Sequence, residues 1–542
     1  MFDSLRKFQY KQTFAQTMKR RIELKKIRGR VLENAGAPAP QWELFAIAGG
    51  TGVIVVGTAI GTVLRYLFQI AVAKNLGPEL FGVFILGFSI FKIAAMAAEF
   101  GLPQANLRFL PIYQADHDQA KTKGVVYSSI RIVLFSGLTI GFLTILWSRP
   151  VTINLFHNPD VRKSLIPLAV LLPLAAVTTI LTSATQGFKI MKYKVLVTDI
   201  FEPAARIILV SGLFLAGLRL EGVLASYMAA TIMAVLLAWH YLKKAFPPLA
   251  DRSIIPVDQT AKLLSFAWPI FLFKFFGALL LWTDTLFLGY FKTAEDVGIY
   301  SAVQRTVMVG SVMITSVNTI FSPYISQLFH QNQTQRLSGL FKTVAKWTLT
   351  TSLPIYIGLI FFARPVLNVF GPKFTSGATP LIILCLGWLV NSCTGSLGVM
   401  ITMTGRPILN FGSAAGVLLI NILLNLILIP RYGVPGAAMA TAVSLTLGNL
   451  ISLVIVRFLL KMHPYRADFL KPLFSGFAST VLLLVLRGYL FRGSSSLVMI
   501  LELLIFLLAY IIFLVLMRFS EEEKSTFYQL KKMLGDKTST PA

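Results

Sequence analysis

The sequence predicts an all-α polytopic membrane protein with about fourteen transmembrane helices. Hydrophobic residues make up 55% of its 542 residues and charged residues only 13%, whereas soluble domains carry about a quarter charged residues. The mean hydropathy is +0.72. Apolar runs of the roughly 20 residues needed to cross about 30 Å of hydrocarbon recur along the chain. This composition excludes soluble enzymes, disordered proteins and small disulfide-stabilised domains.

The first 45 residues precede the apolar runs and are rich in Lys and Arg. Hydrophobic residues recur among them near helical spacing until Pro38 and Pro40, which cannot continue a helix. We expect a basic amphipathic helix on the cytoplasmic surface of the membrane; a disordered basic tail is the alternative. The expected spans follow at residues 50–73, 80–98, 125–147, 164–185, 197–216, 220–242, 264–289, 297–323, 339–363, 377–404, 408–429, 434–460, 470–490 and 497–517.

The charge distribution predicts which way the chain crosses the membrane. Lys and Arg number 50 against 23 Asp and Glu, a formal charge of +27. Membrane proteins concentrate Lys and Arg in cytoplasmic loops, and the loops on the side of the amino terminus hold most of them here. Both termini are therefore expected in the cytoplasm. No nucleic-acid-binding motif accompanies the positive charge, so we expect no nucleic acid partner.

Three short matches indicate an internal repeat of the kind found in transporters. Glu79–Phe84 matches Glu295–Tyr300 at a spacing of 216 residues, and two further pairs match at a spacing of 214, namely Leu155–Phe156 with Val369–Phe370 and Gly222–Ala225 with Gly436–Met439. The matches predict two six-helix bundles related by a pseudo-two-fold axis along the membrane normal; chance similarity among apolar helices is the alternative. The expected division is an arm over 1–45, bundles over 46–250 and 251–463, two additional helices over 464–519, and a cytoplasmic tail over 520–542.

Six of the basic residues inside the predicted spans are of particular interest: Arg65, Lys92, Arg131, Arg206, Lys274 and Arg305. Each costs about 3 kcal/mol at the centre of a membrane helix unless it is paired or faces water. Glu202 lies one turn before Arg206, so these two are expected to form a structural ion pair. Arg131 is near a helix end and can reach the membrane surface, which leaves it as a secondary candidate.

The other four cations, Arg65, Lys92, Lys274 and Arg305, lie on corresponding helices of the two repeats. None has an acid three or four residues away, and Glu99 and Asp284 are expected toward the membrane edges. These four cations predict a substrate-binding cationic cavity that receives a phosphate or pyrophosphate group. Long-range pairing or snorkelling is the alternative, and Asp284 is a secondary candidate for the site.

Other chemistry has little support in the sequence. No phosphate-binding loop of the Gly-x-x-x-x-Gly-Lys-Ser/Thr type is present, and the five histidines lack the spacing of metal ligands. No catalytic residues, cofactor or metal are therefore expected, and the chain is predicted to be a transporter and not an enzyme. Three glycine pairs, Gly57/Gly61, Gly137/Gly141 and Gly412/Gly416, are expected to allow close helix packing.

Four stretches in order resemble polysaccharide flippases of the Wzx type, which carry O-antigen or capsule repeat units, within the multidrug/oligosaccharidyl-lipid/polysaccharide exporter superfamily. They are Ala73–Gly82, Glu99–Ala105 with Arg108, Phe370–Phe374 and Ile429–Ala438. The resemblance covers about residues 45–517. It implies a multi-pass protein of the plasma (inner) membrane that takes part in lipopolysaccharide or exopolysaccharide biosynthesis.

The resemblance further implies that the chain moves a polyprenyl-pyrophosphate-linked oligosaccharide to the outer leaflet by alternating access. Its partners would be that lipid-linked substrate, membrane lipids and polysaccharide polymerase or assembly proteins. A flippase for the peptidoglycan lipid precursor is a related alternative. A cation-coupled multidrug exporter is a different one, and the absence of acids from the first span counts against it. A structural scaffold, in which the four cations have no role, is the non-transport alternative.

Overall fold

The computed structural model describes residues 41–489 and 496–517. Nearly all of the predicted basic arm and the whole predicted tail over 520–542 lie outside the described residues. Compact packing divides the chain into residues 1–56 and residues 57–542. All the packing below belongs to residues 57–542, and the predicted division of these into two bundles and two additional helices stays a prediction.

The secondary structure of the described residues consists of helices joined by short connections, and they contain no strand. The first half contains α2 (Gln41–Glu99), α3 (Leu102–Ala115), α4 (Gln119–Leu146), α5 (Ser148–Pro150), η1 (Val151–Leu155), α6 (Val161–Gly187), α7 (Met191–Lys194), η2 (Val195–Phe201), α8 (Glu202–Leu215), α9 (Leu220–Ala245) and η3 (Pro247–Leu249). The second half contains α10 (Thr260–Phe291), α11 (Ala294–His330), α12 (Thr334–Phe361), α13 (Ala363–Asn368), η4 (Pro372–Gly377), α14 (Ala378–Thr394), α15 (Leu397–Met403), α16 (Pro407–Tyr432) and α17 (Val434–Leu460). The last elements are η5 (Ala467–Phe469), α18 (Leu470–Tyr489) and α19 (Ser496–Leu516). The predicted all-helical fold class is confirmed.

Every predicted span overlaps a helix, although the boundaries differ. The first two both lie in α2, which is interrupted where Gly77 adopts φ 75° and Pro78 follows; proline lacks the N–H that would continue the helix. By length and composition alone, eleven helical stretches in the described part of the chain can cross a membrane, and Leu501–Leu516 is a shorter apolar helix. The count of fourteen crossings therefore stays a prediction.

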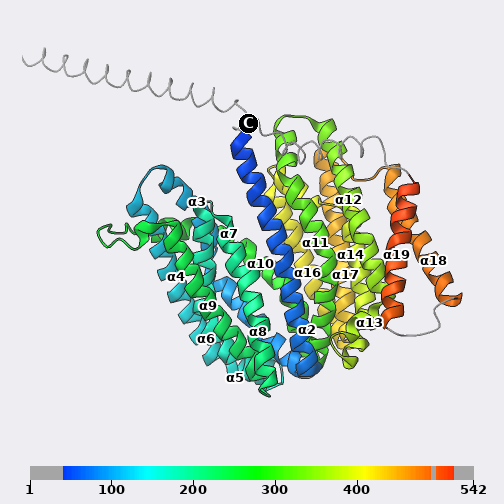
Figure 1. Cartoon of the computed structure of the whole chain (residues 1–542), viewed down its shortest axis with the longest axis horizontal. Helices are drawn as coiled ribbons and strands as arrows, with labels where there is room; N and C mark the ends of the chain where they lie inside the picture. Colours follow the sequence, from blue (N-terminus) through cyan, green and yellow to red (C-terminus); the bar gives the residue numbers. More distant parts are fainter. Residues whose placement is uncertain (1–40, 490–495, 518–542) are drawn as a thin grey trace, which may run out of the picture. The chain divides into compact units, whose positions relative to one another are not determined.

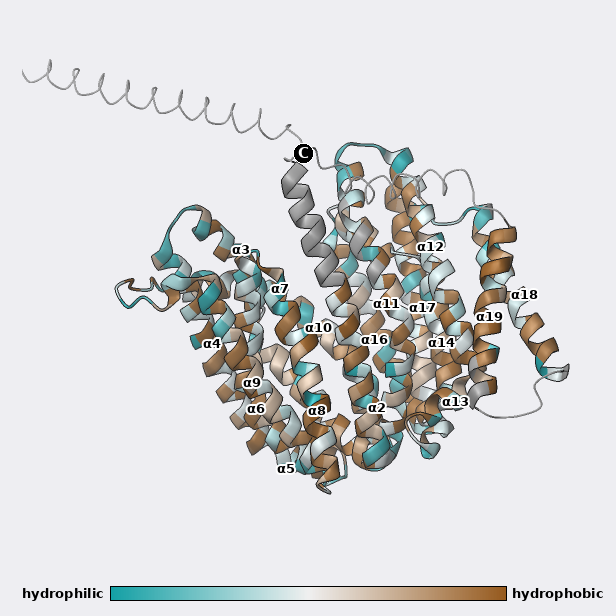
Figure 2. Cartoon of the chain, viewed as in Figure 1, coloured by the Kyte–Doolittle hydropathy of each residue, from teal (hydrophilic) through white to brown (hydrophobic). Residues whose placement is uncertain are grey.

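The helices of each half pack mainly on one another. α4, α6, α8 and α9 form one group, with α3 against α6, and α11, α12, α14, α16 and α17 form another, while α18 and α19 pair beside α12 (Figure 1). Helix α10 packs on α3 and α4 and also on α16 and α17, so it contacts both groups. Hydrophobic residues run along the helices and hydrophilic ones gather at the loops (Figure 2).

Large apolar side chains cover the outside of the helices as well as their core. On α4, Phe135, Leu138 and Phe142 recur at helical spacing with 60–74% of their surface exposed. Such a surface would be insoluble in water and suits hydrocarbon, in which the helices satisfy their own backbone hydrogen bonds. The exposed apolar face therefore marks the surface that contacts lipid.

Contacts between the halves have the reciprocal form that a two-fold axis requires. A Cβ atom added to Gly82 would lie 1.6 Å from the carbonyl oxygen of Ala294, and one added to Gly298 would lie 2.0 Å from that of Pro78. Ala294 is 216 residues after Pro78, and Gly298 is 216 after Gly82. Each repeat thus contacts the other through the same two positions, as in any isologous interface.

The matched phenylalanines of the two halves also contact the opposite half. Phe156, from the first half, lies against Gly289 of α10, where an added Cβ would be 2.9 Å from the phenyl ring. Its repeat partner Phe370, from the second half, packs edge-on against Tyr66 of α2 with ring centroids 5.8 Å apart. The predicted internal repeat is therefore visible in how the two halves meet.

Candidate functional site

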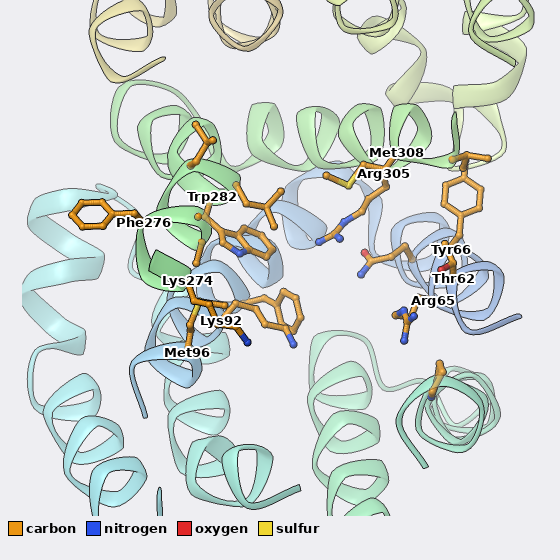
Figure 3. Close-up of a pocket in the computed structure, with 18 of the residues that line it drawn as sticks. Thr62, Arg65, Tyr66, Lys92, Met96, Lys274, Phe276, Trp282, Arg305 and Met308 are labelled. Carbon is orange, nitrogen blue, oxygen red and sulfur yellow. The ribbon is translucent and has the colours of Figure 1, made fainter. Parts of the chain in front are cut away.

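A cavity of about 730 Å³ lies where the two halves meet, and side chains of α2, α8, α9, α10, α11 and α16 line it (Figure 3). This volume falls within the usual range of about 300–1,000 Å³ for ligand pockets. Among the described residues that line it, five are basic and none is acidic; the basic ones are Arg65, Lys92, Arg206, Lys274 and Arg305. The structure thus brings the four cations selected from the sequence to one cavity, together with Arg206.

Among the described residues, only Arg65 of these four cations has an acid partner within 4.0 Å. Its Nη1 lies 3.4 Å from Oδ1 of Asp199, whose other oxygen is 2.9 Å from Lys194 Nζ. The approach depends on small residues, because a Cβ added to Gly61 would lie 2.3 Å from the Asp199 carbonyl oxygen. Helix α2 and η2 therefore come close enough for a pair that joins positions 134 residues apart.

Lys92, Arg206 and Arg305 lie over the rings of a buried aromatic cluster made of Phe88, Tyr227 and Trp282. Phe88 meets Tyr227 and Trp282 at ring centroid distances of 5.5 and 5.9 Å. The cations lie above this cluster, with Lys92 Nζ 5.2 Å from Phe88, Arg206 Cζ 3.9 Å from Tyr227, and Arg305 Cζ 5.6 Å from Trp282. Cation–π contacts hold a cation without cancelling its charge.

The acids near these cations do not themselves line the cavity. Glu202 pairs with Arg206, as expected from their spacing. Glu99, at the end of α2, interacts electrostatically with both Lys92 and Lys274. Within the described residues, Lys92, Lys274 and Arg305 have no carboxylate within 4.0 Å. The three acids Asp199, Glu202 and Glu99 therefore offset the five cations only in part.

Neutral side chains fill the rest of the wall. α10 and α16 contribute an apolar side that includes Phe273, Phe276, Leu281 and Phe411, and α11 adds Met308. Phe273 packs against Phe411 with ring centroids 5.7 Å apart. The cavity is therefore cationic on the side of α2, α8 and α11 and mainly apolar on the side of α10 and α16, although Lys274 also comes from α10.

Asp284 is buried between helices and does not line the cavity. It is 2% exposed, among α10, α11, α16 and α17. One carboxyl oxygen accepts hydrogen bonds from Asn421 and Asn425 at 3.1 and 2.7 Å, and the other accepts from Tyr300 at 2.5 Å and from Thr441. These oxygens are of the type that hard cations bind, and here hydrogen bonds among the side chains occupy them.

Arg131 also lies away from the cavity. Its Nη2 is 2.8 Å from Oδ1 of Asp258 in the segment that joins α9 to α10, and both side chains are largely exposed. Hydrogen bonds from Thr260 and Ser128 lower the pKa of the Asp258 carboxyl to about 2. Lys123 donates to the carbonyl oxygens of Asp251 and Ile254. Arg131 therefore helps to hold this segment on α4.

Arg206 and Gln69 of the cavity, and the partners of Asp284, were missed from the sequence. Arg206 was assigned to its ion pair, which does not prevent its other side from facing the cavity. Gln69 has no charge to single it out. Asn421 and Asn425 carried a usable signal, since two polar residues one turn apart in an apolar helix indicate a buried face. No group of three or more His, Cys, Asp or Glu residues suits a metal in the described part of the chain.

Comparisons with known proteins identify the family of the chain. The model of the family described as polysaccharide biosynthesis protein matches residues 47–329, more than half of the chain. The chain belongs to the polysaccharide biosynthesis protein family. The MatE family model also matches, over residues 269–427. The resemblance identified from the sequence is thereby confirmed at the level of the superfamily.

Individual relatives are distant but extensive. The probable low-salt glycan biosynthesis flippase Agl15 of Haloferax volcanii is 26% identical over 404 residues, which cover 73% of this chain and 81% of the relative. The lipid II flippase MurJ in an inward closed conformation has a TM-score of 0.68 at 19% identity, covering 88% of this chain and 98% of MurJ.

An inward-facing multidrug resistance MATE family transporter has a TM-score of 0.62 at 14% identity, covering 74% of this chain and 94% of the transporter. Both structural likenesses show a shared fold. This member of the family is accordingly a multi-pass membrane transport protein and not an enzyme.

Proposed function

We propose that the chain moves a polyprenyl-pyrophosphate-linked oligosaccharide from the cytoplasmic to the outer leaflet of the plasma membrane by alternating access between its two halves. Both termini would then lie in the cytoplasm. The single observation that carries the proposal is a cavity wall with five basic and no acidic side chains among its described residues. A pyrophosphate supplies the negative charge that this wall lacks, and Arg and Lys are its usual partners.

The contacts suggest unequal roles for the cations. Arg305, Lys92 and Lys274 have no carboxylate within 4.0 Å among the described residues, so in this proposal they form the main pyrophosphate site. Arg65 shares Asp199 with Lys194 and contributes less. The family and a glycan biosynthesis flippase among the relatives support a lipid-linked glycan as cargo. A polymerase or assembly protein as partner remains part of the proposal.

Transport of the peptidoglycan lipid precursor is a second candidate, favoured by the fold shared with the lipid II flippase MurJ. It needs the same cationic cavity, because that cargo is also a pyrophosphate-linked saccharide. A cation-coupled drug exporter would bind positively charged compounds, and the basic wall opposes them. The charge of the cavity thus separates the flippase functions from drug export.

Affinity measurements on the purified full chain test the charge of the site. We expect geranylgeranyl pyrophosphate to bind much more tightly than geranylgeraniol. Arg305→Gln should weaken the pyrophosphate about ten- to hundredfold, since a hydrogen bond to a charged group contributes about 1.5–3 kcal/mol. Arg65→Gln should weaken it only a few-fold, because Asp199 already offsets that charge.

Arg131→Gln is the matched control, because Arg131 is exposed and paired with Asp258 outside the cavity. Its affinity for the pyrophosphate should equal that of the wild type. Equal binding of the alcohol and the pyrophosphate, or full affinity in Arg305→Gln, would contradict the proposed site.

A further inference from the structure

One face of α2 carries four polar residues that line the cavity: Thr62, Arg65, Tyr66 and Gln69. Their spacing of three, four and seven residues places them on the same side of a helix. Figure 3 shows Thr62, Arg65 and Tyr66 together on this helix, and Lys92, Lys274 and Trp282 together in another part of the cavity. We call the face formed by Thr62, Tyr66 and Gln69 the acceptor face.

The hydroxyl groups on the acceptor face already donate their hydrogens within the protein. Thr62 donates to the carbonyl oxygen of Thr58 at 2.8 Å. Thr306 donates to Ala302 at 2.8 Å, so Tyr66, whose oxygen is 3.2 Å from that of Thr306, is the donor in their shared hydrogen bond. A hydroxyl that has donated its hydrogen can still accept. Thr62 and Tyr66 therefore offer oxygen lone pairs to a ligand.

Gln69 adds an acceptor that has no hydrogen-bond partner in the described part of the chain. The residue is 7% exposed, and its Oε1 atom is buried without a hydrogen bond. A buried polar atom left in this state costs about 1–3 kcal/mol. The structure retains this cost at a residue that lines the cavity, where rotation of the amide group would present Oε1 to a ligand that supplies the missing donor.

Pyrophosphate cannot supply it, because its oxygens accept hydrogen bonds and carry negative charge at neutral pH. Placed against the hydroxyl groups of Thr62 and Tyr66, it would meet lone pairs. Hydroxyl groups and amide N–H groups are the donors that fit, and a saccharide carries many of them. Asp199 partly offsets the positive charge of Arg65. This end of the cavity therefore also suits the less charged part of such a substrate.

We propose that the acceptor face is the saccharide subsite of the cavity, in which Gln69 Oε1 accepts a hydrogen bond from a hydroxyl or acetamido N–H group of the sugar next to the pyrophosphate. Gln69 is then a specificity-determining residue. It distinguishes a glycosylated lipid carrier from a bare one, while Arg305, Lys92 and Lys274 bind the pyrophosphate common to both. This assignment rests on the proposed function.

The test compares two probes on the full chain: geranylgeranyl pyrophosphate, and the same lipid carrying one N-acetylglucosamine on its pyrophosphate. The wild type should bind the sugar-bearing probe about tenfold more tightly, the effect of about 1.4 kcal/mol in binding energy. Gln69→Leu should remove this preference and leave the affinity for the bare pyrophosphate unchanged. Thr62→Val, a smaller change on the same face, should reduce the preference about threefold.

Gln104→Leu is the matched control, since the Oε1 atom of Gln104 on α3 is also buried without a partner but does not line the cavity. It should keep the full preference. If the wild type shows no preference for the sugar, or Gln69→Leu retains it, the subsite assignment is wrong while the pyrophosphate site stands. If instead Arg305→Gln binds both probes like the wild type, the pyrophosphate site is wrong, and a loss of preference in Gln69→Leu still supports the saccharide subsite.

Discussion

Asp284 shows how one buried carboxyl group organises several helices. Its two oxygens accept from Tyr300 of α11, Thr441 of α17, and Asn421 and Asn425 of α16, while Asp284 itself belongs to α10. A carboxyl group can satisfy this many donors at once because it offers about four lone-pair sites. We interpret the cluster as a structural joint that fixes the second part of α10 to the helices of its own half.

Removing that carboxyl should destabilise the protein. Asp284→Ala leaves the buried donors of Asn421, Asn425 and Tyr300 without their acceptor, at about 1–3 kcal/mol for each unsatisfied group. We expect the melting temperature in detergent to fall by about 5 °C or more, and Asp284→Asn to give a smaller fall because it retains one acceptor. Asp116→Ala, at an exposed position, is the control. A wild-type melting temperature for Asp284→Ala would show that the cluster does not hold these helices together.

Single residues explain what the sequence could and could not predict about the site. The four cavity cations were found because an isolated charge in an apolar helix demands an explanation. The Arg65–Asp199 ion pair was not predicted, because its two residues are 134 positions apart and only tertiary packing brings η2 against Gly61. Gln69 was not predicted, because the sequence does not show whether an amide among apolar residues has a hydrogen-bond partner.

Helices α2 and α11 cross with their backbones in contact. Gly82 of one faces Gly298 of the other, and a Cβ atom at either position would overlap a carbonyl oxygen of the opposite helix. The crossing lies at the end of the helices where the Gly77 kink turns α2 back. In the conformation described, this crossing therefore holds the two halves together at the end where α2 is kinked.

Adding a methyl group at this crossing should force the two helices apart. Overpacking costs about 1–3 kcal/mol, so Gly82→Ala and Gly298→Ala should each melt several degrees below the wild type. Gly416→Ala is a matched control within a helix, because nothing lies within 4 Å of its added Cβ. It should melt at or slightly above the wild-type temperature, since alanine favours a helix over glycine. Equal melting of Gly82→Ala and Gly416→Ala would exclude the crossing as a tight contact.

Glycine pairs at four-residue spacing were thus an incomplete guide to packing. Gly57 and Gly61 approach η2, and Gly137 and Gly141 approach α6, as expected. The prediction for Gly412 and Gly416 was wrong, because Phe411, Ala414 and Ala415 on the same helix face the cavity and leave these glycines without a neighbour. Helix α3 lies between two of the predicted spans, and its Pro103 occupies the first turn, where proline is tolerated.

The assembled halves explain why the cavity has its composition. Helix α2 contributes Arg65 and Lys92 to the cavity, and the corresponding helices α10 and α11 of the second half contribute Lys274 and Arg305, so cations from both halves line one space. Repetition of this type is visible in the sequence as a constant spacing. The cavity wall also contacts Asp199, Glu202 and the aromatic cluster. These contacts depend on the packing of helices that are distant in the sequence, so no local sequence pattern predicts them.

Transport itself is the most direct test of a cationic cavity that carries a pyrophosphate-linked saccharide between leaflets. The measurement uses proteoliposomes containing a fluorescent prenyl-pyrophosphate-linked saccharide, and it follows the fraction that a membrane-impermeant quencher reaches with time. The wild type should move the lipid faster than protein-free vesicles do. Arg305→Gln should slow this movement about tenfold or more, whereas Arg131→Gln should match the wild type. Transport by Arg305→Gln at the wild-type rate, or none by the wild type, would contradict the account.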